Sequence, residues 1–154
     1  MMNISIDTAK EEDLIKVYEI EKESFSDSWS FESFVYELKL NFSNFFIAKC
    51  DTGDVAGGDV AGYIILWQIE DELNILNLAV KKEFRRQSVA KGLLEHVFNF
   101  GKERKIQKVY LEVREGNLPA LNLYKTYGFK IIGTRENYYP DSKDAILMYK
   151  NLKE

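Results

Sequence analysis

The spacing of apolar residues predicts two helices in the first quarter of the chain. Thr8, with Glu11 three residues later, has the pattern of a capping box, which predicts a helix that begins at Thr8 and ends near Phe25. Ser30 is a typical N-cap residue and predicts a second, shorter helix. The apolar face of the first helix is formed by Leu14, Val17 and Tyr18, and that of the second by Phe34, Val35 and Leu38.

Aromatic and β-branched residues then replace the helical pattern. Residues 44–50 and 63–68 are rich in them, which predicts the two strands of a hairpin. The link between these strands contains the tetrapeptide Asp-Val-Ala-Gly twice, at 54–57 and at 59–62. Such a short repeat cannot be the unit of a repeat protein. We therefore expect it to lengthen the turn.

The next segments predict a strand–helix–strand unit. Residues 73–80 are almost continuously apolar, which is typical of a parallel strand buried on both faces. An amphipathic helix follows, and residues 108–113 then alternate between apolar and polar as in a second strand. The helix has Val89, Leu93, Leu94 and Val97 on its apolar face and Lys91, Glu95, Asn99 and Lys102 on its solvent face.

The end of the chain predicts one more helix and two closing strands. Pro119 and Gly128 frame the short helix, and the strands cover about 129–138 and 145–152. Together the elements predict an α/β (α+β) fold with a mixed, strongly twisted sheet of about six to seven strands. Helices are expected on both faces, around a central parallel βαβ unit. The 154 residues are about the length of one domain, so we expect a single domain over 1–154.

Composition and charge narrow the classes of function. A hydrophobic share of 45% and a charged share of 30% are typical of a globular domain and exclude a disordered chain. No apolar run approaches the ~20 residues of a membrane span, and residues 1–12 lack the apolar stretch of a secretory signal, so a cytoplasmic protein is expected. The net charge of -4 argues against nucleic acid as a direct partner and suits a cationic substrate.

The chain has one cysteine and one histidine, Cys50 and His96. A buried free cysteine usually packs as a small hydrophobe, which is what we expect of Cys50. His96 lies in the middle of the amphipathic helix, two turns beyond its start, and we expect it to have no chemical role. With so few ligands of the usual kinds, no metal site is expected.

A basic turn precedes the amphipathic helix, with the sequence Arg-Arg-Gln-Ser-Val-Ala-Lys-Gly at 85–92. Backbone N–H groups at a helix N-terminus have no partner within the helix, and the helix dipole is positive there. Such a turn can hold a pyrophosphate. By itself it is more often a solvated cap, but its place after a buried strand favours a site.

The turn resembles the signature of the GNAT acetyltransferase family, Arg/Gln-x-x-Gly-x-Gly/Ala, in the form Arg85-x-x-Ser88-x-Ala90. Further segments resemble the same family at 77–80, 111–114, 117, 120–124, 128–129 and 137–140. The resemblance implies the GNAT fold, acetyl-CoA as co-substrate and no metal. It further implies acetyl transfer to the N-terminal α-amine of a basic protein, with the N-terminal alanine of a small-subunit ribosomal protein as the acceptor. One departure is Ser88, where the family prefers glycine.

The resemblance assigns a role to each matching residue. The pyrophosphate turn would be Arg86, Gln87, Ser88, Val89, Ala90 and Lys91, and the pantetheine arm would lie beside Leu78, Ala79 and Val80. Asn117 would hydrogen-bond the cofactor, although its spacing fits a helix N-terminal residue equally well. Glu112 matches the general base and Tyr124 the general acid. Tyr138 and Tyr139 match the loop that lines the acceptor groove.

Pattern alone would assign plainer roles to several of these side chains. It would make Glu112 an exposed strand residue, Tyr124 a core aromatic, and Tyr138 and Tyr139 strand-end packing. Two other functions also stay open. One is a small-molecule amine acetyltransferase of the polyamine or aminoglycoside type, because one fold hosts many acceptors. The other is a CoA-binding module without catalysis, which the joint presence of a base and an acid argues against.

Overall fold

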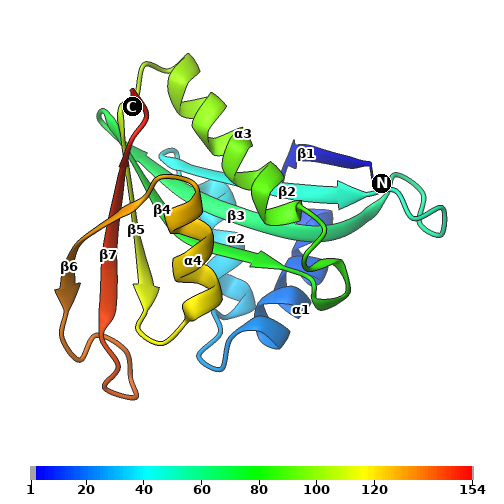
Figure 1. Cartoon of the computed structure of the whole chain (residues 1–154). Helices are drawn as coiled ribbons and strands as arrows, with labels where there is room; N and C mark the ends of the chain where they lie inside the picture. Colours follow the sequence, from blue (N-terminus) through cyan, green and yellow to red (C-terminus); the bar gives the residue numbers. More distant parts are fainter. Residues whose placement is uncertain (1–2, 154) are drawn as a thin grey trace.

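A computed structural model describes residues 3–153, which form one mixed sheet of seven strands in the order β1-β2-β3-β4-β5-β7-β6 (Figure 1). All neighbouring strands are antiparallel except β4 and β5, which are parallel. The predicted mixed α/β architecture is therefore confirmed. The strands are β1 (Ile4–Thr8), β2 (Ser43–Cys50), β3 (Asp59–Ile69), β4 (Glu72–Val80), β5 (Lys108–Arg114), β6 (Lys130–Arg135) and β7 (Ala145–Asn151).

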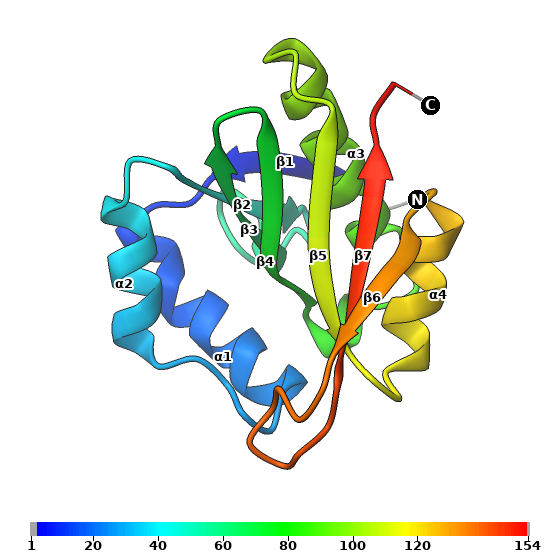
Figure 2. The ribbon, with the colours of Figure 1, turned by 90° about the vertical axis from the view of Figure 1, so that its left-hand side faces the viewer.

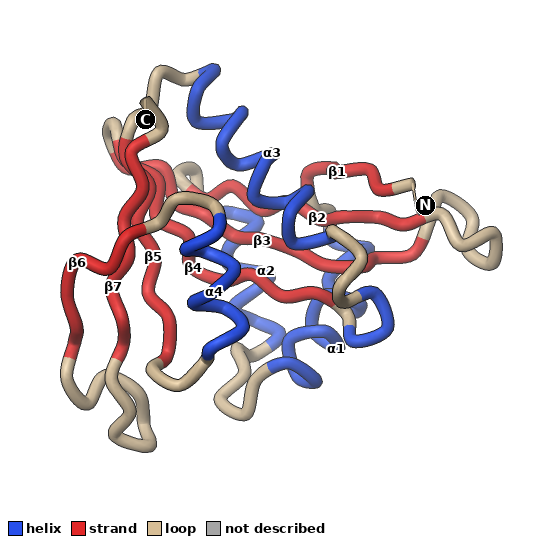
Figure 3. Tube along the Cα trace, viewed as in Figure 1, coloured by secondary structure: helices blue, strands red, loops and turns tan. Residues whose placement is uncertain are grey.

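Helices cover both faces of the sheet, as predicted. Figure 3 shows α3 and α4 in front of the strands and α1 and α2 behind and below them. In Figure 2 no helix lies in front of β5, β7 and β6, so α1 and α2 leave that part of their face open. The helices are α1 (Leu14–Ser24), α2 (Phe31–Lys39), α3 (Val89–Glu103) and α4 (Leu118–Thr126), with 3-10 turns at Glu11–Asp13 and Lys82–Phe84.

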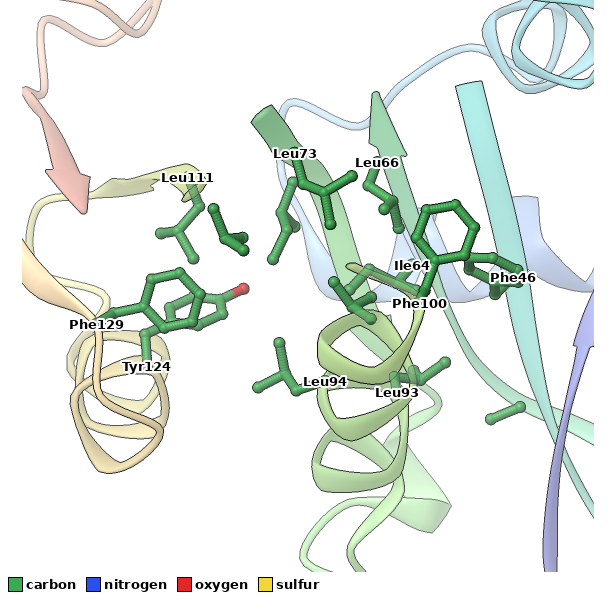
Figure 4. Packing of buried hydrophobic residues seen from close by; sticks show 14 of the residues in the cluster. Phe46, Ile64, Leu66, Leu73, Leu93, Leu94, Phe100, Leu111, Tyr124 and Phe129 are labelled. Atoms are coloured by element: carbon green, nitrogen blue, oxygen red, sulfur yellow. The ribbon is translucent and has the colours of Figure 1, made fainter. Parts of the chain in front are cut away.

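Each covered face has its own apolar core. The core beneath α3 and α4 includes Leu93 and Leu94 of α3, Leu73 of β4 and Leu111 of β5 (Figure 4). The core beneath α1 and α2 is built from the other face of the first strands and includes the fully buried Phe34. The amphipathic pattern of α3 is confirmed, because its predicted apolar residues are buried and its predicted solvent residues are exposed. Within residues 3–153 no helix combines the length and the apolar character needed to cross a membrane.

The predicted start of the first helix is wrong. Thr8 does not cap a helix but ends β1, where it pairs with Phe46 of β2. The chain then turns at Lys10, whose N–H donates to the carboxylate of Asp13 at 2.9 Å, and α1 begins at Leu14. Pairing along the edge of the sheet outweighed the local capping pattern. The other cap predictions are confirmed, since α1 ends before Phe25 and the Ser30 hydroxyl accepts from the Ser33 N–H at 3.2 Å.

The two copies of the duplicated tetrapeptide adopt different secondary structures. Residues 54–57 lie in the turn, as predicted, but residues 59–62 are buried in β3, which begins earlier than expected. Asp59, paired with Cys50, is held there by ion pairs with Lys81 at 3.0 Å and Lys16 at 3.5 Å. Because these lysines compensate its charge, the second copy can be part of a strand.

The prediction that 73–80 is buried on both faces is also wrong. Burial along β4 alternates, because Leu73 and Ile75 enter the core under α3 while Glu72 and Asn74 lie on the face that no helix covers. The parallel pairing with β5 is confirmed but short. It runs only from Glu72, opposite Lys108, to Ile75, opposite Leu111.

Candidate active site

Beyond Ile75, β4 and β5 separate, and a cavity opens between them. The separation coincides with a bulge in β4, because Ile65 and Leu66 of β3 pair with Asn77 and Ile75, which leaves Leu76 as an extra residue. A bulge bends and twists its strand, so β4 turns away from β5 here. The cavity between the strands measures about 670 Å³ and is also walled by α1 and α4.

This cavity brings together several of the predicted site residues. Its lining includes Leu78 of β4, Glu112 of β5, Asn117 and Tyr124 at α4, and Tyr139 of the loop between β6 and β7. The chain separates the first and last of these by 61 positions, and the opening of the sheet gathers them around one space. The other predicted residues lie at the end of β4, in the turn before α3 and at the start of α3, and in the loop after β6.

The predicted pantetheine segment forms the end of β4. Leu78 and Val80 pack toward the α3 core, whereas Ala79 is buried against the α1 core. Ala79 can therefore offer a ligand in the cavity only its backbone. On the side facing β5, this part of β4 has no strand partner among the described residues, because the ladder ends at Ile75. Apart from the Val80 carbonyl, which accepts from Arg85, the backbone groups on this side are thus available for hydrogen bonds.

The predicted pyrophosphate turn has a left-handed backbone at two positions. Arg86 has φ of 61° and Ser88, the N-cap of α3, has φ of 67°. Ser88 makes no side-chain cap hydrogen bond, and the first bond of the helix runs from the Gly92 N–H to the Ser88 carbonyl at 3.0 Å. The N–H groups of the first helical turn therefore remain open to a ligand. Glycine adopts positive φ without steric cost, which is a second reason, besides close approach, for the family's preference at Ser88.

Side chains fix this turn against its surroundings. The Arg85 guanidinium donates to the Val80 carbonyl and to the Ser24 hydroxyl, each at 3.0 Å. Gln87 donates its side-chain amide to the Glu83 carbonyl at 3.2 Å. Arg86 and Lys91 are exposed. Arg85 and Gln87 thus hold the loop, while Arg86 and Lys91 add positive charge near the start of α3.

Glu112 lies between two cavities. It belongs to the open face of β5, and its side chain is 30% exposed. Its carboxylate forms an ion pair with the Arg135 Nε at 2.9 Å. Besides the cavity already described, it lines a second one of about 570 Å³ on the open face of the sheet. The charge of Glu112 is also the main cause that raises the pKa of Tyr138, which lines that second cavity.

Tyr124 is a buried phenol that lines the first cavity. Its ring packs edge to face against Phe129 with centroids 5.5 Å apart, and its hydroxyl points away from α4 toward α3 (Figure 4). Burial raises its pKa well above the usual value, because the phenolate would be poorly solvated there. Tyr124 therefore holds its proton at neutral pH.

Asn117 confirms the plainer of its two predicted roles. Its side-chain oxygen accepts from the Ala120 N–H at 3.3 Å, which makes it the N-cap of α4. The amide nitrogen of the same side chain is still a donor, and Asn117 lines the first cavity. The two predicted roles are therefore compatible.

Sequence reasoning missed a buried carboxylate at the side of the cavity. Glu21 of α1 is 1% exposed and accepts hydrogen bonds from the Tyr63 hydroxyl, the Asn77 side-chain amide at 2.7 Å and the Trp29 N–H at 2.8 Å. Burial and this carboxylate raise the pKa of Tyr63. The network ties α1 to the bulged part of β4 and to the start of α2. A signal was present, because Glu21 follows Leu14 and Val17 at helical spacing on the apolar face.

Sequence reasoning also missed an arginine that joins two loops. Arg114, at the end of β5, forms ion pairs with Asp27, before α2, at 2.9 Å and with Asp141, between β6 and β7, at 2.5 Å. Its guanidinium also lies 4.2 Å from the centre of the Tyr139 ring. The two loops therefore meet over the end of β5. Tyr138 and Tyr139 pack edge to face with centroids 5.1 Å apart.

His96 and Cys50 lie away from this cavity. His96 packs against Phe46 with ring centroids 4.5 Å apart, and burial lowers its pKa. Cys50 is buried in β2. Among residues 3–153 no group of three or more histidine, cysteine or acidic side chains is arranged to hold a metal ion.

Comparison with known proteins agrees with this geometry. Residues 14–129 match the model of the acetyltransferase (GNAT) family. A Bacillus subtilis protein described as a candidate ribosomal protein bS18-alanine N-acetyltransferase is 37% identical over 145 residues, which cover 93% of this chain and 92% of that protein.

Solved structures show the same fold. The Escherichia coli ribosomal-protein-S18-alanine N-acetyltransferase superposes with a TM-score of 0.87 at 29% identity, covering 97% of this chain and 94% of that one. Arabidopsis thaliana NAA60 in complex with acetyl-CoA has a TM-score of 0.87 at 19% identity, covering 99% of this chain and 100% of that one.

Proposed function

The chain belongs to the GNAT acetyltransferase family, and from this premise we propose that it moves the acetyl group of acetyl-CoA to the α-amine of a protein N-terminus. The proposed acceptor is the N-terminal alanine of a small-subunit ribosomal protein, as in the names of the Bacillus subtilis and Escherichia coli proteins. The observation that carries the proposal is the opening between β4 and β5, because Glu112 and Tyr124 both line the cavity within it.

The residues of the turn before α3 fit the pyrophosphate of acetyl-CoA. Open N–H groups at a helix N-terminus, left-handed residues in the preceding turn and the exposed charges of Arg86 and Lys91 are features of anion sites. Leu78 to Val80 would hold the pantetheine arm along the free edge of β4, and the Asn117 amide would donate to the cofactor. When bound there, acetyl-CoA supplies the acetyl group as an activated thioester.

Glu112 and Tyr124 would move the two protons of the reaction. Glu112 accepts a proton from the acceptor ammonium, since only the free amine can attack a carbonyl carbon. Backbone N–H groups of β4 stabilise the negative charge that develops on the carbonyl oxygen. Tyr124 donates its proton to the departing thiolate. The bond from carbon to nitrogen forms and the bond from carbon to sulfur breaks. The nitrogen loses its second proton as the amide forms, and this proton restores the phenol of Tyr124, while Glu112 passes the first proton to solvent.

The surroundings of Glu112 favour a polypeptide acceptor. The second cavity leads from Glu112 onto the open sheet face, so a chain attached to the reacting residue has space to continue. Tyr138 and Tyr139 would bracket its first residues. A small amine has no need of such a path, and a module that only bound CoA would have no need of an acid and a base beside one cavity.

An acetylation screen tests this proposal. Acetyl-CoA would be offered with an array of N-terminal peptides that differ in the first residue, and separately with spermidine and an aminoglycoside. We expect the highest kcat/KM with alanine-initiated basic peptides. A higher kcat/KM with spermidine or the aminoglycoside would contradict the proposed acceptor and leave the family assignment intact.

A further inference from the structure

The second cavity extends along the open face of the sheet, away from the reaction centre. At one end it shares Glu112 and Tyr139 with the first cavity. At the other end it is lined by Glu72 and Asn74 of β4 and by Tyr110 of β5. Figure 2 shows that α1 and α2 lie to one side of these strands and leave the face open. A ligand held at Glu112 could therefore continue along this face.

The far end of the second cavity carries a negative charge, that of Glu72, which no positive charge in the lining neutralises. Three charged residues line the cavity, and two of them, Glu112 and Arg135, neutralise each other at 2.9 Å. Glu72 forms no ion pair with another residue of the described part of the chain. Lys108 is level with Glu72 on β5, but it does not line the cavity. A half-buried carboxylate thus remains for a positively charged ligand.

Tyr110 lines the same end of the cavity as this carboxylate. Tyr110 pairs with Asn74, one step along the same face from Glu72, and its ring lies 5.2 Å from that of Tyr149. A carboxylate accepts hydrogen bonds from ammonium or guanidinium groups, and the face of a tyrosine attracts the same cations. The far end of the cavity therefore has the chemistry to bind a lysine or arginine side chain.

The length of the path indicates which residue of the acceptor would arrive there. Four residues of β5 separate Glu112 from the level of Glu72. At ~3.3 Å per residue this is about 13 Å, which an extended peptide covers with about four residues. If the first residue of the acceptor lies at Glu112, its fourth or fifth residue lies near Glu72.

We propose that this open face binds the acceptor polypeptide beyond its first residue, with Glu72 and Tyr110 receiving a lysine or arginine side chain at its fourth or fifth position. The inference rests on the proposed function, because it begins from an N-terminus held at Glu112. It adds a determinant of specificity that lies apart from the reacting groups. The acceptor is then recognised by its following sequence as well as by its first residue.

Three alanine-initiated peptides test the inference with wild type and two variants. Two are seven residues long, with either arginine or glutamine at positions four and five, and the third has only three residues. Glu72→Gln removes the charge from the cavity, whereas Asp71→Asn removes the same charge from the adjacent turn outside its lining. The quantity compared is kcat/KM, together with the Kd of acetyl-CoA.

Wild type should prefer the arginine peptide over the glutamine peptide by about five- to tenfold, the scale of a partly exposed ion pair beside an aromatic ring. Glu72→Gln should lose most of this preference, with unchanged activity on the three-residue peptide and unchanged acetyl-CoA affinity. Asp71→Asn should keep it.

If wild type acetylated the two long peptides with equal kcat/KM, this inference would be overturned while the proposed function would stand. If Asp71→Asn lost the preference for the arginine peptide as fully as Glu72→Gln, the inference would also be overturned. The preference would then come from long-range attraction by negative charge and not from binding in the cavity. Acetylation of none of the three peptides would overturn the proposed function and the inference with it.

Discussion

The carboxylate of Glu112 is paired with Arg135, whose Nε lies 2.9 Å away across the open face of the sheet. The Arg135 guanidinium also lies 5.8 Å from the centre of the Tyr138 ring, so the pair links β5 to the loop between β6 and β7. Under the proposed function, Glu112 has two separable roles. It could serve as a proton acceptor, and it could hold the loop through Arg135.

The first prediction separates these two functions. Glu112→Gln removes the proton acceptor and the ion pair, whereas Arg135→Gln removes the ion pair and the contact with Tyr138 but keeps the carboxylate. We expect Glu112→Gln to lower kcat by about 10²-fold or more and Arg135→Gln to lower it by less than about tenfold. Steady-state kinetics with an alanine-initiated peptide measures both. Equal losses would mean that Glu112 acts only by holding the loop.

The second prediction concerns Tyr124 as a proton donor. Tyr124→Phe should lower kcat by about 10²-fold while the Kd of acetyl-CoA, measured by calorimetry, stays within about twofold. Because burial raises the pKa of this phenol, its donor form persists above the pH at which an ordinary tyrosine ionises. The rate of wild type should therefore show no decline from ionisation of Tyr124 up to about pH 9.5.

Tyr127→Phe is the matched control, because Tyr127 follows the same helix and its ring packs near Phe98. It should leave kcat almost unchanged. A loss of acetyl-CoA affinity in Tyr124→Phe in proportion to its loss of rate would instead make Tyr124 a packing or binding group.

The third prediction uses the left-handed backbone at Ser88. A side chain at positive φ costs about 1–2 kcal/mol, and the greater freedom of glycine in the unfolded chain offsets part of this gain, so Ser88→Gly should raise the melting temperature by about 2–4 °C. Ser88→Val should lower it, because a β-branched residue tolerates this conformation least. The Kd of acetyl-CoA should change by less than about tenfold in Ser88→Gly. It should be highest in Ser88→Val, which is expected to bind acetyl-CoA most weakly.

Ser142 provides a control of the same residue type and backbone conformation, with φ of 66° in the loop between β6 and β7. Ser142→Gly should also raise the melting temperature, with no change in acetyl-CoA affinity. If Ser88→Gly has no effect on thermal unfolding, the backbone at this position is not strained.

The fourth prediction concerns pH and the only histidine. Burial lowers the pKa of His96 below that of the unfolded chain, so the unfolded state binds a proton more readily. The contribution of the neutral His96 to stability is fully present above the unfolded pKa of ~6.5. It is lost as the pH falls from there through the lower pKa of the folded state. Melting temperatures between pH 8 and 5 should therefore fall less steeply in His96→Gln than in wild type. Its kcat should stay within about threefold, whereas a loss of 10²-fold would assign His96 a chemical role.

Much of the fold could be predicted because local pattern and tertiary structure agree. The apolar stripe of α3 has helical spacing and lies against the sheet, and Ser30 and Asn117 cap their helices through their own side chains. The edge strand β1 was missed, because Thr8 and Glu11 carry a capping pattern and only pairing with β2 overrides it. Such long-range pairing leaves little trace in a short segment.

The site was predicted unevenly for the same reason. Glu112, Tyr124 and the turn at Ser88 belong to contiguous motifs that resemble the family. Glu21 and Arg114 act through partners far away in the chain, such as Tyr63 and Asp141. Helical spacing places Glu21 on an apolar face, but no local pattern reveals the partners of either residue. The bulge at Leu76 likewise arises from pairing with β3.

The most direct measurement for the central claim identifies which nitrogen receives the acetyl group. A peptide that begins with alanine and contains several lysines would be incubated with acetyl-CoA and the enzyme, and the product fragmented in a mass spectrometer. The account predicts one acetyl group, on the α-nitrogen of alanine, with Glu112→Gln giving the same product far more slowly. Acetylation mainly on lysine ε-nitrogens would contradict it.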